Sequence, residues 1–276
     1  MTSAAPNRVP LVRGPHRSRE ILGMRVDATS YADACSLILG WSSTDTGRYV
    51  GIANVNNVME SHDDPAYLAV MRAADLVTPD GMPLVWALRW LGIDGATRVY
   101  GPTLMAELCR EAERLDVPIG LYGGSPDVLA ALVDNLQRRH PHLRIAYAVS
   151  PPFRPASPAE DAATVDEIAA SGARLLFVGL GAPKQERWMA AHRGSVDAVM
   201  VGVGAAFDFI AGAKRQAPAI MQRAGLEWLF RLMTEPRRLW RRYAKHNPRF
   251  VALLIAQLVR NKRGSGRSAR GPGSGR

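Results

Sequence analysis

The sequence predicts an α/β fold: a mostly parallel sheet with flanking helices, followed by a basic helical appendage. Strand-like apolar runs alternate with helix-like segments from residue 21 to residue 203, which is the pattern of successive β-α-β units. Three of these runs end in glycine turns, and in a parallel sheet such turns open at one edge. Beyond residue 218 the pattern is helical only, and the charge becomes strongly positive.

Each element of the core follows from its local pattern of side chains. Short aliphatic runs predict strands at 21–26, 48–54, 117–124, 143–149, 174–180 and 197–203. Helical spacing of apolar residues predicts helices near 30–41, 64–74, 81–91, 158–171 and 183–193. A further helix is expected after Ser125, which suits the N-cap, with Pro126 in its first turn and Asp127 near the positive end of its dipole.

The predicted core spans residues 19–217 and the appendage residues 218–263. Pro236 and Pro248 divide the appendage, and each is expected to begin a helix. The apolar run at 250–259 is too short to cross a bilayer, so it is expected either to pack on the core or to lie at an interface. Residues 1–18 and 264–276, rich in Gly, Ser, Pro and Arg, are expected to be disordered.

Composition excludes several classes of protein. The 276 residues are 47% hydrophobic and 22% charged, as in an ordinary globular protein. Two cysteines in predicted helices offer no disulfide framework and no CxxC metal pattern, which fits a reducing cytoplasm. Residues 1–20 are basic but lack the apolar centre of a signal peptide. With no apolar run of about 18 residues, we expect no transmembrane helix.

The net charge of +10 is placed unevenly along the chain. From Lys214 onward there are 16 Lys and Arg residues but only two acids, Glu227 and Glu235. This asymmetry indicates an anionic partner: nucleic acid, an anionic membrane surface or a phosphate-bearing ligand. A cluster within about one helical turn could present several guanidinium groups to phosphate on one face, or could simply face solvent: Arg238, Arg241 and Arg242.

The glycine turns that follow three predicted strands are Gly123-Gly124, Gly179-x-Gly181 and Gly202-x-Gly204. On one edge of the sheet they suggest a crevice in which backbone N–H groups approach a nucleotide diphosphate. Neither the dinucleotide fingerprint nor the Walker A pattern is matched.

The stretch VGLGAPKQERWM, residues 178–189, places three polar residues on the first turn of a helix: Lys184, Gln185 and Glu186. Pro183 also suits that turn. The positive end of the helix dipole there favours phosphate. The alternative is a tight turn whose polar residues face water.

Three other polar residues lie on turns or short links between the predicted elements. Asp80, in a Pro-Asp-Gly turn, is either a general base on a loop or a turn and capping residue. Arg98 lies on a short link before the next helix, where a surface arginine is the alternative. Asp208 lies between two phenylalanines and suits a sugar hydroxyl or a local cap.

Taken together, these stretches resemble the WecG/TagA/CpsF family of bacterial glycosyltransferases, glycosyltransferase family 26. The resemblance covers roughly residues 20–245. It rests on TPDG at 78–81, RVYGPTLM at 98–105, LYGGSPDVL at 121–129, VGLGAPKQERWM at 178–189, GVGAAFDFIAGAKRQAP at 202–218 and GLEWLFRLMTEPRRLWRR at 225–242. It implies a Rossmann-like (GT-E type) core whose appendage contacts the membrane. It also implies transfer of a sugar, typically N-acetylmannosamine, from a UDP-sugar to an undecaprenyl-diphosphate-linked N-acetylglucosamine; some members transfer glucose or related hexoses.

The resemblance assigns roles to residues. Asp80 would be the general base of an inverting reaction, and Arg98 would stabilise diphosphate charge. Asn54 matches a Thr-x-Asn strand end, but Ile52 stands where the family has threonine. The appendage arginines expected to bind diphosphate are Arg231, Arg238 and Arg241. The remaining expected substrate-binding residues are Gly123, Gly124, Gly179, Gly181, Lys184, Gln185, Glu186, Gly204 and Asp208.

The chain has no Asp-x-Asp motif of the kind that holds a divalent metal at a diphosphate, so we expect no metal and no cofactor besides the UDP-sugar substrate. The resemblance implies a cytoplasmic protein, peripheral on the inner face of the plasma membrane. It leaves the oligomeric state open. The alternatives are a nucleic-acid-binding protein, which lacks a recognition motif here, and a Rossmann-type oxidoreductase, which lacks the dinucleotide fingerprint.

Overall fold

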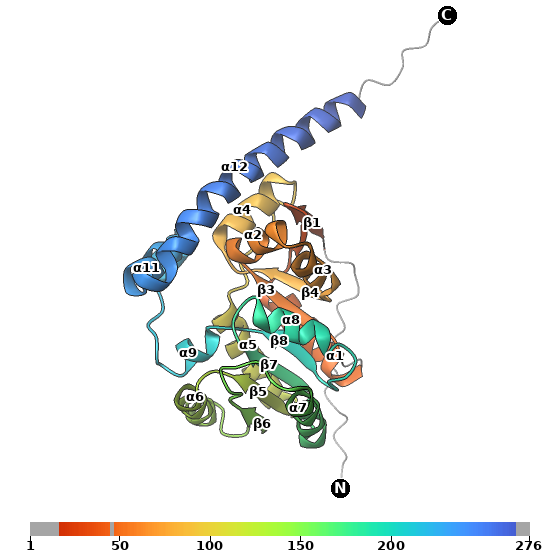
Figure 1. Ribbon diagram of the computed structural model, residues 1–276, viewed down its shortest axis with the longest axis vertical. Coiled ribbons are helices and arrows are strands. Elements are labelled where there is room, and N and C mark those ends of the chain that lie inside the picture. Colours follow the sequence, from red (N-terminus) through yellow and green to blue (C-terminus); the bar gives the residue numbers. More distant parts are fainter. Residues whose placement is uncertain (1–16, 45–46, 269–276) are drawn as a thin grey trace, which may run out of the picture.

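A six-stranded parallel sheet forms the centre of the protein, as the computed structural model shows for residues 17–44 and 47–268 (Figure 1). The disorder expected for 1–16 and 269–276 lies outside these residues. The strand order is β4-β3-β8-β7-β5-β6. The strands are β3 (Tyr49–Ala53), β4 (Leu76–Pro79), β5 (Ile119–Gly123), β6 (Ile145–Val149), β7 (Leu175–Gly179) and β8 (Val199–Gly202). The predicted fold class is confirmed.

Helices cover both faces of the sheet because its central strands are apolar on both sides. Along β7, Leu175 and Phe177 pack into one apolar layer, and Leu176 and Val178 into the other, which explains the continuous apolar run. The first layer contains α1 (Tyr31–Thr44), α5 (Gly101–Arg114), α6 (Pro126–Arg139) and α9 (Ala206–Ile210). The second contains α2 (Val55–Asp63), α3 (Pro65–Ala73), α4 (Met82–Trp90), α7 (Pro158–Ser171) and α8 (Lys184–Ala191).

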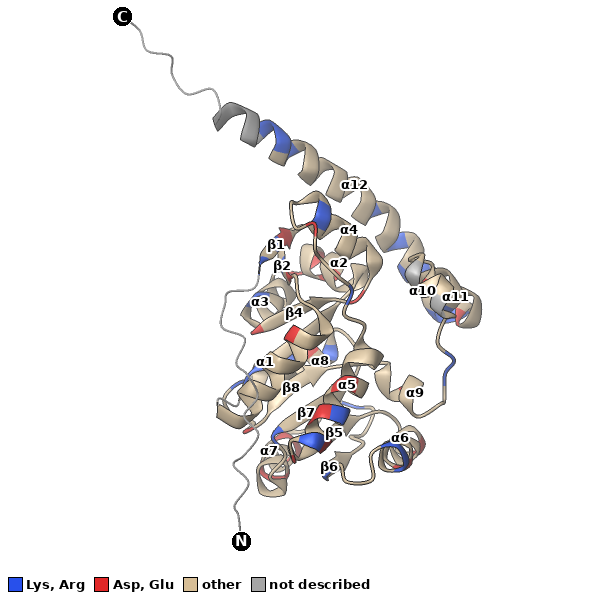
Figure 2. Ribbon diagram, turned by 180° about the vertical axis from the view of Figure 1, so that it is seen from behind, with Lys and Arg blue, Asp and Glu red and all other residues tan. Residues whose placement is uncertain are grey.

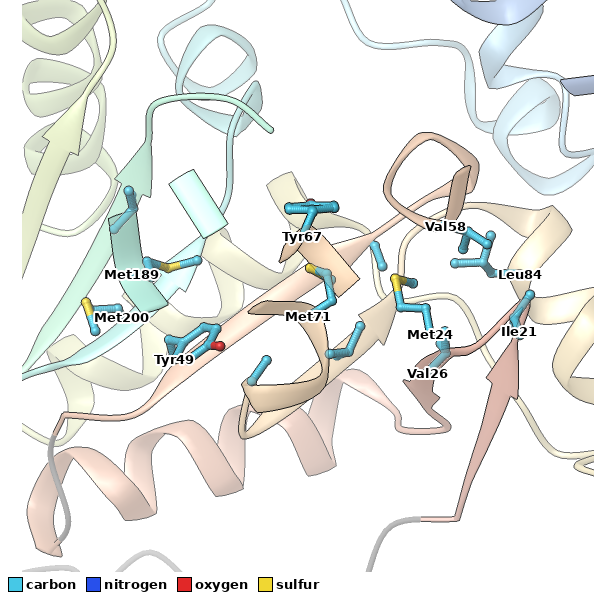
Figure 3. Close-up of a cluster of buried hydrophobic side chains, with 14 of the residues drawn as sticks. Ile21, Met24, Val26, Tyr49, Val58, Tyr67, Met71, Leu84, Met189 and Met200 are labelled. Atoms are coloured by element: carbon cyan, nitrogen blue, oxygen red, sulfur yellow. The ribbon is translucent and has the colours of Figure 1, made fainter. Parts of the chain in front are cut away.

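The segment predicted as one strand at 21–26 is instead part of a hairpin outside the main sheet. Strands β1 (Ser18–Ile21) and β2 (Met24–Asp27) pair antiparallel. Leu22 and Gly23 both have positive φ, 51° and 90°, as a two-residue hairpin turn requires. The prediction was wrong because Leu22 gave no turn signal. The hairpin adds Ile21, Met24 and Val26 to the apolar layer (Figure 3).

Two elements at the candidate site were not predicted. Strand β4 has only four residues, and its apolar run, Leu76–Pro79, is too short for a clear pattern. Helix α2 begins directly after β3, with Asn54 as its N-cap. The Asn54 side chain accepts a hydrogen bond from the backbone N–H of Asn56 at 2.9 Å. The sequence contains one signal for α2: Asn54, a residue type favoured at helix N-caps, directly follows the strand.

The appendage consists of α10 (Ala219–Arg223), α11 (Glu227–Thr234) and α12 (Pro236–Ser268). Figure 2 shows its lysines and arginines distributed along α12. Helix α12 begins at Pro236 as predicted, but Pro248 lies inside it and does not begin a new helix. Order also continues past residue 263, where disorder was expected. Packing overrides the proline, because Phe250 and Leu254 are each only 3% exposed against the core.

Helix α12 runs across the end of the core beside α2 (Figure 1). The apolar run at 250–259 has two faces: Phe250 and Leu254 pack inward, whereas Val251 and Ile255 are more than half exposed. Packing and exposure, which we expected as alternatives, therefore occur together. No helix within the described residues is long and apolar enough to cross a membrane.

Candidate active site

A cavity of about 450 Å³ lies between the core and the appendage. Residues that follow β3 and β4 form its floor, and α4, α11 and α12 form its walls. Parallel α/β sheets bind ligands beyond the carboxyl ends of their strands, and the cavity lies at those ends of β3 and β4. We therefore consider this cavity the candidate active site.

Asp80 lies on the cavity floor, directly after β4. Its backbone N–H donates to the carbonyl of Ala53 at 2.8 Å, so strand pairing fixes the start of the turn. Burial raises the pKa of Asp80 to about 6; the charge of Arg98 opposes this rise, and that of Glu227 adds to it. A carboxylate whose pKa lies near neutrality is suited to accept a proton from a substrate hydroxyl.

Arg98, on the link between α4 and α5, contacts both the core and the appendage. Its Nη2 donates to Oδ1 of Asp80 at 3.4 Å and to Oε2 of Glu227. Its Nε donates to the backbone carbonyl of Asp80, and Nη1 donates to Oε1 of Gln222 at 3.5 Å. The guanidinium lies 4.3 Å from the ring centroid of Tyr100. Each of its three nitrogens therefore has a protein partner.

Asn54 lines the cavity at the end of β3. Asn57 Oδ1 accepts from the Asn54 backbone N–H at 3.1 Å, which completes a reciprocal cap and fixes the turn. Ile52, at the position where the resemblance leads us to expect threonine, is 7% exposed and packs in the apolar layer that contains α5. The departure thus replaces a hydroxyl with an apolar side chain.

Arg231 of α11 and Arg242 of α12 also line the cavity. The Nε atoms of both arginines, and Nδ1 of His246, are buried without a hydrogen-bond partner among the described residues. Leaving buried polar groups unpaired costs about 1–3 kcal/mol each, and more when they are charged. Two such cationic groups in one cavity indicate an anionic ligand.

Arg238 and Arg241 lie outside the cavity. Arg238 pairs with Glu235, and its side chain is 53% exposed. The guanidinium of Arg241 lies over the ring of Trp240 on the exposed face of α12. The three clustered arginines do not converge on one face: successive helical residues are rotated by about 100°, so Arg242 lines the cavity, whereas Arg241 lies on the exposed face. Arg238 and Arg241 therefore take the solvent-facing alternative.

The mouth of the cavity has an apolar wall built by two helices. Trp86 and Trp90 lie one turn apart on α4, and Val251 and Ile255 one turn apart on α12. All four are exposed, Trp90 to 63%. An exposed apolar surface beside a charged floor indicates a ligand with an apolar part and an anionic part.

The glycine turns lie outside the cavity and are closely packed. A Cβ on Gly179 would lie 2.6 Å from the ring of Phe207, and one on Gly123 would lie 2.5 Å from the backbone of Gly179. The N–H of Gly124 donates to the Gly179 carbonyl at 3.2 Å. Close packing thus accounts for glycine at 123 and 179. Gly181, with φ of +78°, faces open space instead.

Gln185 and Glu186 are buried at the start of α8. Gln185 Oε1 accepts from the N–H of Gly181 at 3.1 Å, and its Nε2 donates to Glu186 Oε1 at 3.0 Å. The amide also fills the space beside Gly204. Asn57 of α2 donates to Glu186 Oε1 at 3.5 Å, and burial raises the pKa of Glu186. These two residues connect α8 to its neighbours.

The remaining predicted residues are nearer to solvent. Lys184 is exposed as the first residue of α8, and Pro183 lies at the N-cap rather than in the first turn. Asp208 pairs with Lys214 at 3.3 Å, and Lys214 also lies 3.7 Å from Glu235. Asp208 therefore takes part in a charge network between the core and the appendage.

The structure thus brings together in the cavity four of the predicted residues: Asn54, Asp80, Arg98 and Arg231. The others lie outside it: Gly123, Gly124, Gly179, Gly181, Lys184, Gln185, Glu186, Gly204, Asp208, Arg238 and Arg241. Our site prediction missed several residues that line it: Trp86, Gln222, Glu227, Arg242 and His246. For Glu227 the sequence contained a signal, because it is one of only two acids in a strongly basic segment.

No three His, Cys, Asp or Glu side chains within residues 17–44 and 47–268 are grouped as a metal ion would require. Metal independence stays a prediction to be tested in solution. The two cysteines, Cys35 and Cys109, are buried and free.

A family profile described as "Glycosyl transferase WecG/TagA/CpsF family" matches residues 19–264. The chain is 31% identical over 210 residues to the N-acetylglucosaminyldiphosphoundecaprenol N-acetyl-beta-D-mannosaminyltransferase of Bacillus spizizenii. That alignment covers 76% of this chain and 79% of the relative.

Proposed function

Since the chain belongs to the WecG/TagA/CpsF family of glycosyltransferases, we propose that it transfers N-acetylmannosamine from its UDP form to an undecaprenyl-diphosphate-linked N-acetylglucosamine. The relative's name supports the sugar and the acceptor. Such a step serves the synthesis of cell-surface polysaccharide or teichoic-acid-type polymers. Family membership replaces the oxidoreductase and nucleic-acid-binding alternatives, because the family's activity is glycosyl transfer.

One observation supports the acceptor most directly: the cavity joins an anion-binding floor to an apolar wall. Arg231 and Arg242 offer buried N–H groups without partners, and Arg donors match phosphate oxygens. Trp86 and Ile255 mark the apolar side. A polyprenyl diphosphate has the same two parts, so its diphosphate would lie on the arginines and its chain against the tryptophans.

In the proposed mechanism Asp80 acts as the general base. Its carboxylate accepts the proton of the acceptor hydroxyl as the hydroxyl oxygen attacks the anomeric carbon of the donor. The bond from that carbon to the UDP oxygen breaks, UDP leaves with the electron pair, and the configuration is inverted. Because the base must be ionised, turnover should fall as the pH falls through about 6, the pKa of Asp80.

Developing negative charge on the diphosphate needs compensation. Arginine supplies fixed positive charge without reorganisation at the moment of reaction. Arg231 and Arg242 are placed for this role, whereas the nitrogens of Arg98 are directed to Asp80, Glu227 and Gln222. We therefore assign charge stabilisation mainly to the appendage, and we expect no divalent metal to be needed.

The appendage also suits an anionic membrane surface. Lysines and arginines line α12 (Figure 2), and each basic residue near anionic lipid contributes about 1 kcal/mol. The exposed apolar residues Val251, Ile255 and Val259 lie on the same helix. We propose that the protein acts at the inner face of the plasma membrane, where its lipid-linked acceptor lies.

The test is turnover with a short-chain lipid-diphosphate N-acetylglucosamine, a panel of UDP-sugars and EDTA, for wild type and Asp80→Asn. We expect transfer from UDP-N-acetylmannosamine that survives EDTA. In the variant, kcat should fall by about 10²- to 10⁴-fold, the usual contribution of a positioned base. Transfer from UDP-glucose alone would retain the mechanism and change the sugar. No transfer from any donor would overturn the proposal.

A further inference from the structure

Arg98 links the candidate base to the appendage through a contact that the transfer reaction itself does not explain. The guanidinium lies between two carboxylates, Asp80 from the core and Glu227 from the first turn of α11. All three side chains are largely buried, with 15%, 20% and 14% of their surfaces exposed for Arg98, Asp80 and Glu227. One cation is thus shared by two acids that are far apart in the sequence.

Because Glu227 shares the guanidinium, Arg98 lowers the basicity of Asp80 less than it would alone. Were Arg98 to face Asp80 alone, its full charge would favour the carboxylate and weaken it as a base. With Glu227 on the same Nη2 nitrogen, much of that charge is compensated. The Arg98 guanidinium is also held in place by the Gln222 side chain and by the ring of Tyr100.

We propose that Glu227 is a positioning residue for the general base: it holds Arg98 against Asp80, so that proton transfer depends on docking of α11. The proposal rests on the proposed function, since it takes Asp80 as the base. It gives the appendage a part in the chemistry beyond lining the cavity. When α11 docks, the base acquires both its orientation and its basicity.

The electrostatics agree with this geometry. Burial raises the pKa of Asp80, Arg98 lowers it, and Glu227 raises it again. A base with a pKa nearer the working pH accepts a proton more effectively. The charged and titratable groups that face Asp80 or line the same cavity are Arg98, Tyr100, Glu227, Arg231, Arg242, Tyr243 and His246.

The first experiment measures kcat against pH for wild type, Glu227→Gln and Glu227→Asp. In wild type the acid limb should lie near pH 6. In Glu227→Gln it should move to lower pH, and turnover above the limb should fall by about tenfold, a fraction of what a positioned base contributes. Glu227→Asp keeps the charge, so its limb should stay near that of wild type.

Glu235→Gln is the matched control, because Glu235 is the other acid of the appendage and pairs with Lys214 and Arg238 rather than Arg98. Its acid limb should stay in place. If Glu227→Gln retains both the wild-type limb and the wild-type turnover, the proposal is overturned. The same holds if Glu235→Gln shifts the limb equally, because the effect would then be one of general charge.

A second measurement needs no substrate. With ¹³C-labelled aspartate carboxyl groups, the NMR titration of Asp80, assigned through Asp80→Asn, should move to lower pH in full-length Glu227→Gln. An unchanged titration would overturn the inference even in an active enzyme. If the titration shifts but wild type transfers no sugar, the proposed function fails and the link between Glu227 and Asp80 stands. The two failures are therefore distinguishable.

Discussion

The cavity beyond β3 and β4 and the glycine turns beyond β5, β7 and β8 lie at the same edge of one sheet, but they differ in how their polar groups are satisfied. In the turns, the N–H groups of Gly124 and Gly181 bond to protein oxygens. In the cavity, the Nε atoms of Arg231 and Arg242 are buried without partners. The backbone N–H groups of these turns are thus bonded within the protein, whereas the cavity leaves cationic N–H groups for a ligand.

The difference shows which signals indicate a ligand. Glycine at 123 and 179 is required by packing against neighbouring backbone and against Phe207, so these glycines alone do not indicate a bound diphosphate. The Nε atoms of Arg231 and Arg242, in contrast, are buried without an acceptor among the described residues, which is costly unless a ligand supplies one. We therefore expect substitutions in the cavity to change kinetics, and those in the packed turns to change stability.

Among substitutions that compare the cavity with the turns, the largest effect is expected from Arg242→Ala, with the adjacent Arg241→Ala as its control. Losing a charge-assisted hydrogen bond costs about 1.5–3 kcal/mol, which corresponds to roughly 10- to 150-fold in kcat/KM for the lipid-linked acceptor. Arg241 lies over Trp240 outside the cavity, so its loss should change kcat/KM by less than about threefold, as for exposed charges. Steady-state kinetics on both variants, with unfolding curves, would measure this difference.

Equal losses in the two variants would contradict the proposed role of Arg242, because the effect would then follow from net charge on α12 rather than from the cavity. A loss in Arg241→Ala alone would restore the arginine assignment that the family resemblance implies.

The next largest effect is a loss of stability, expected for a substitution in the packed glycine turns. Gly179→Ala should lower the free energy of unfolding by about 1–3 kcal/mol, because its methyl group would overlap the Phe207 ring. The KM for the UDP-sugar should be unchanged in the protein that remains folded. Denaturant unfolding and donor titration of the same preparation would test both statements.

Gly181→Ala tests the open side of the same turn, because Gly181 faces open space at φ +78°. Its cost should be about 1–2 kcal/mol of backbone strain. A UDP-sugar KM raised in Gly181→Ala but not in Gly179→Ala would place the donor against the open side of this turn. A raised KM in Gly179→Ala as well would show that the packed turn also binds the donor.

Much of the fold was predictable because the central strands are buried on both faces, which leaves uninterrupted apolar runs such as 175–180 in the sequence. The errors came from tertiary effects. Leu22 adopts positive φ in a hairpin although it is not a typical turn residue, and β4 has only four residues. Pro248 stays within α12 because Phe250 and Leu254 anchor the helix on the core.

The site was predictable only in part, for a related reason. Asp80 and Asn54 follow strands, and their local sequence places them at the sheet edge. The appendage residues Glu227 and Arg242 reach the cavity only because α12 packs along α2 and α11 packs against α12 (Figure 1). Sequence spacing along α12 does not tell which of two adjacent arginines faces inward, because this depends on how the helix docks.

The smallest effect is expected at the ion pair that holds α12 against α2. Two hydrogen bonds of 2.7 and 2.8 Å join Arg249 to Asp63, and chiefly through them the pKa of Asp63 is lowered to about 2. Because the folded-state pKa lies below the ordinary value of about 4, this stabilisation is complete above pH 4 and is lost as the pH falls toward 2. The pair joins α12, which forms a wall of the cavity, to the core, and it lies away from the glycine turns.

Asp63→Asn should therefore raise the acceptor KM by no more than about fivefold, since a pair this exposed contributes little, and it should leave the UDP-sugar KM unchanged. Asp64→Asn is the matched control: Asp64 caps α3 and pairs with Arg187 of α8, away from α12. Kinetics at pH 7 would separate the two. An acceptor KM that moves equally in both variants would mean that the pair does not position α12, and the cavity wall would then depend on the packing of Phe250 and Leu254 alone.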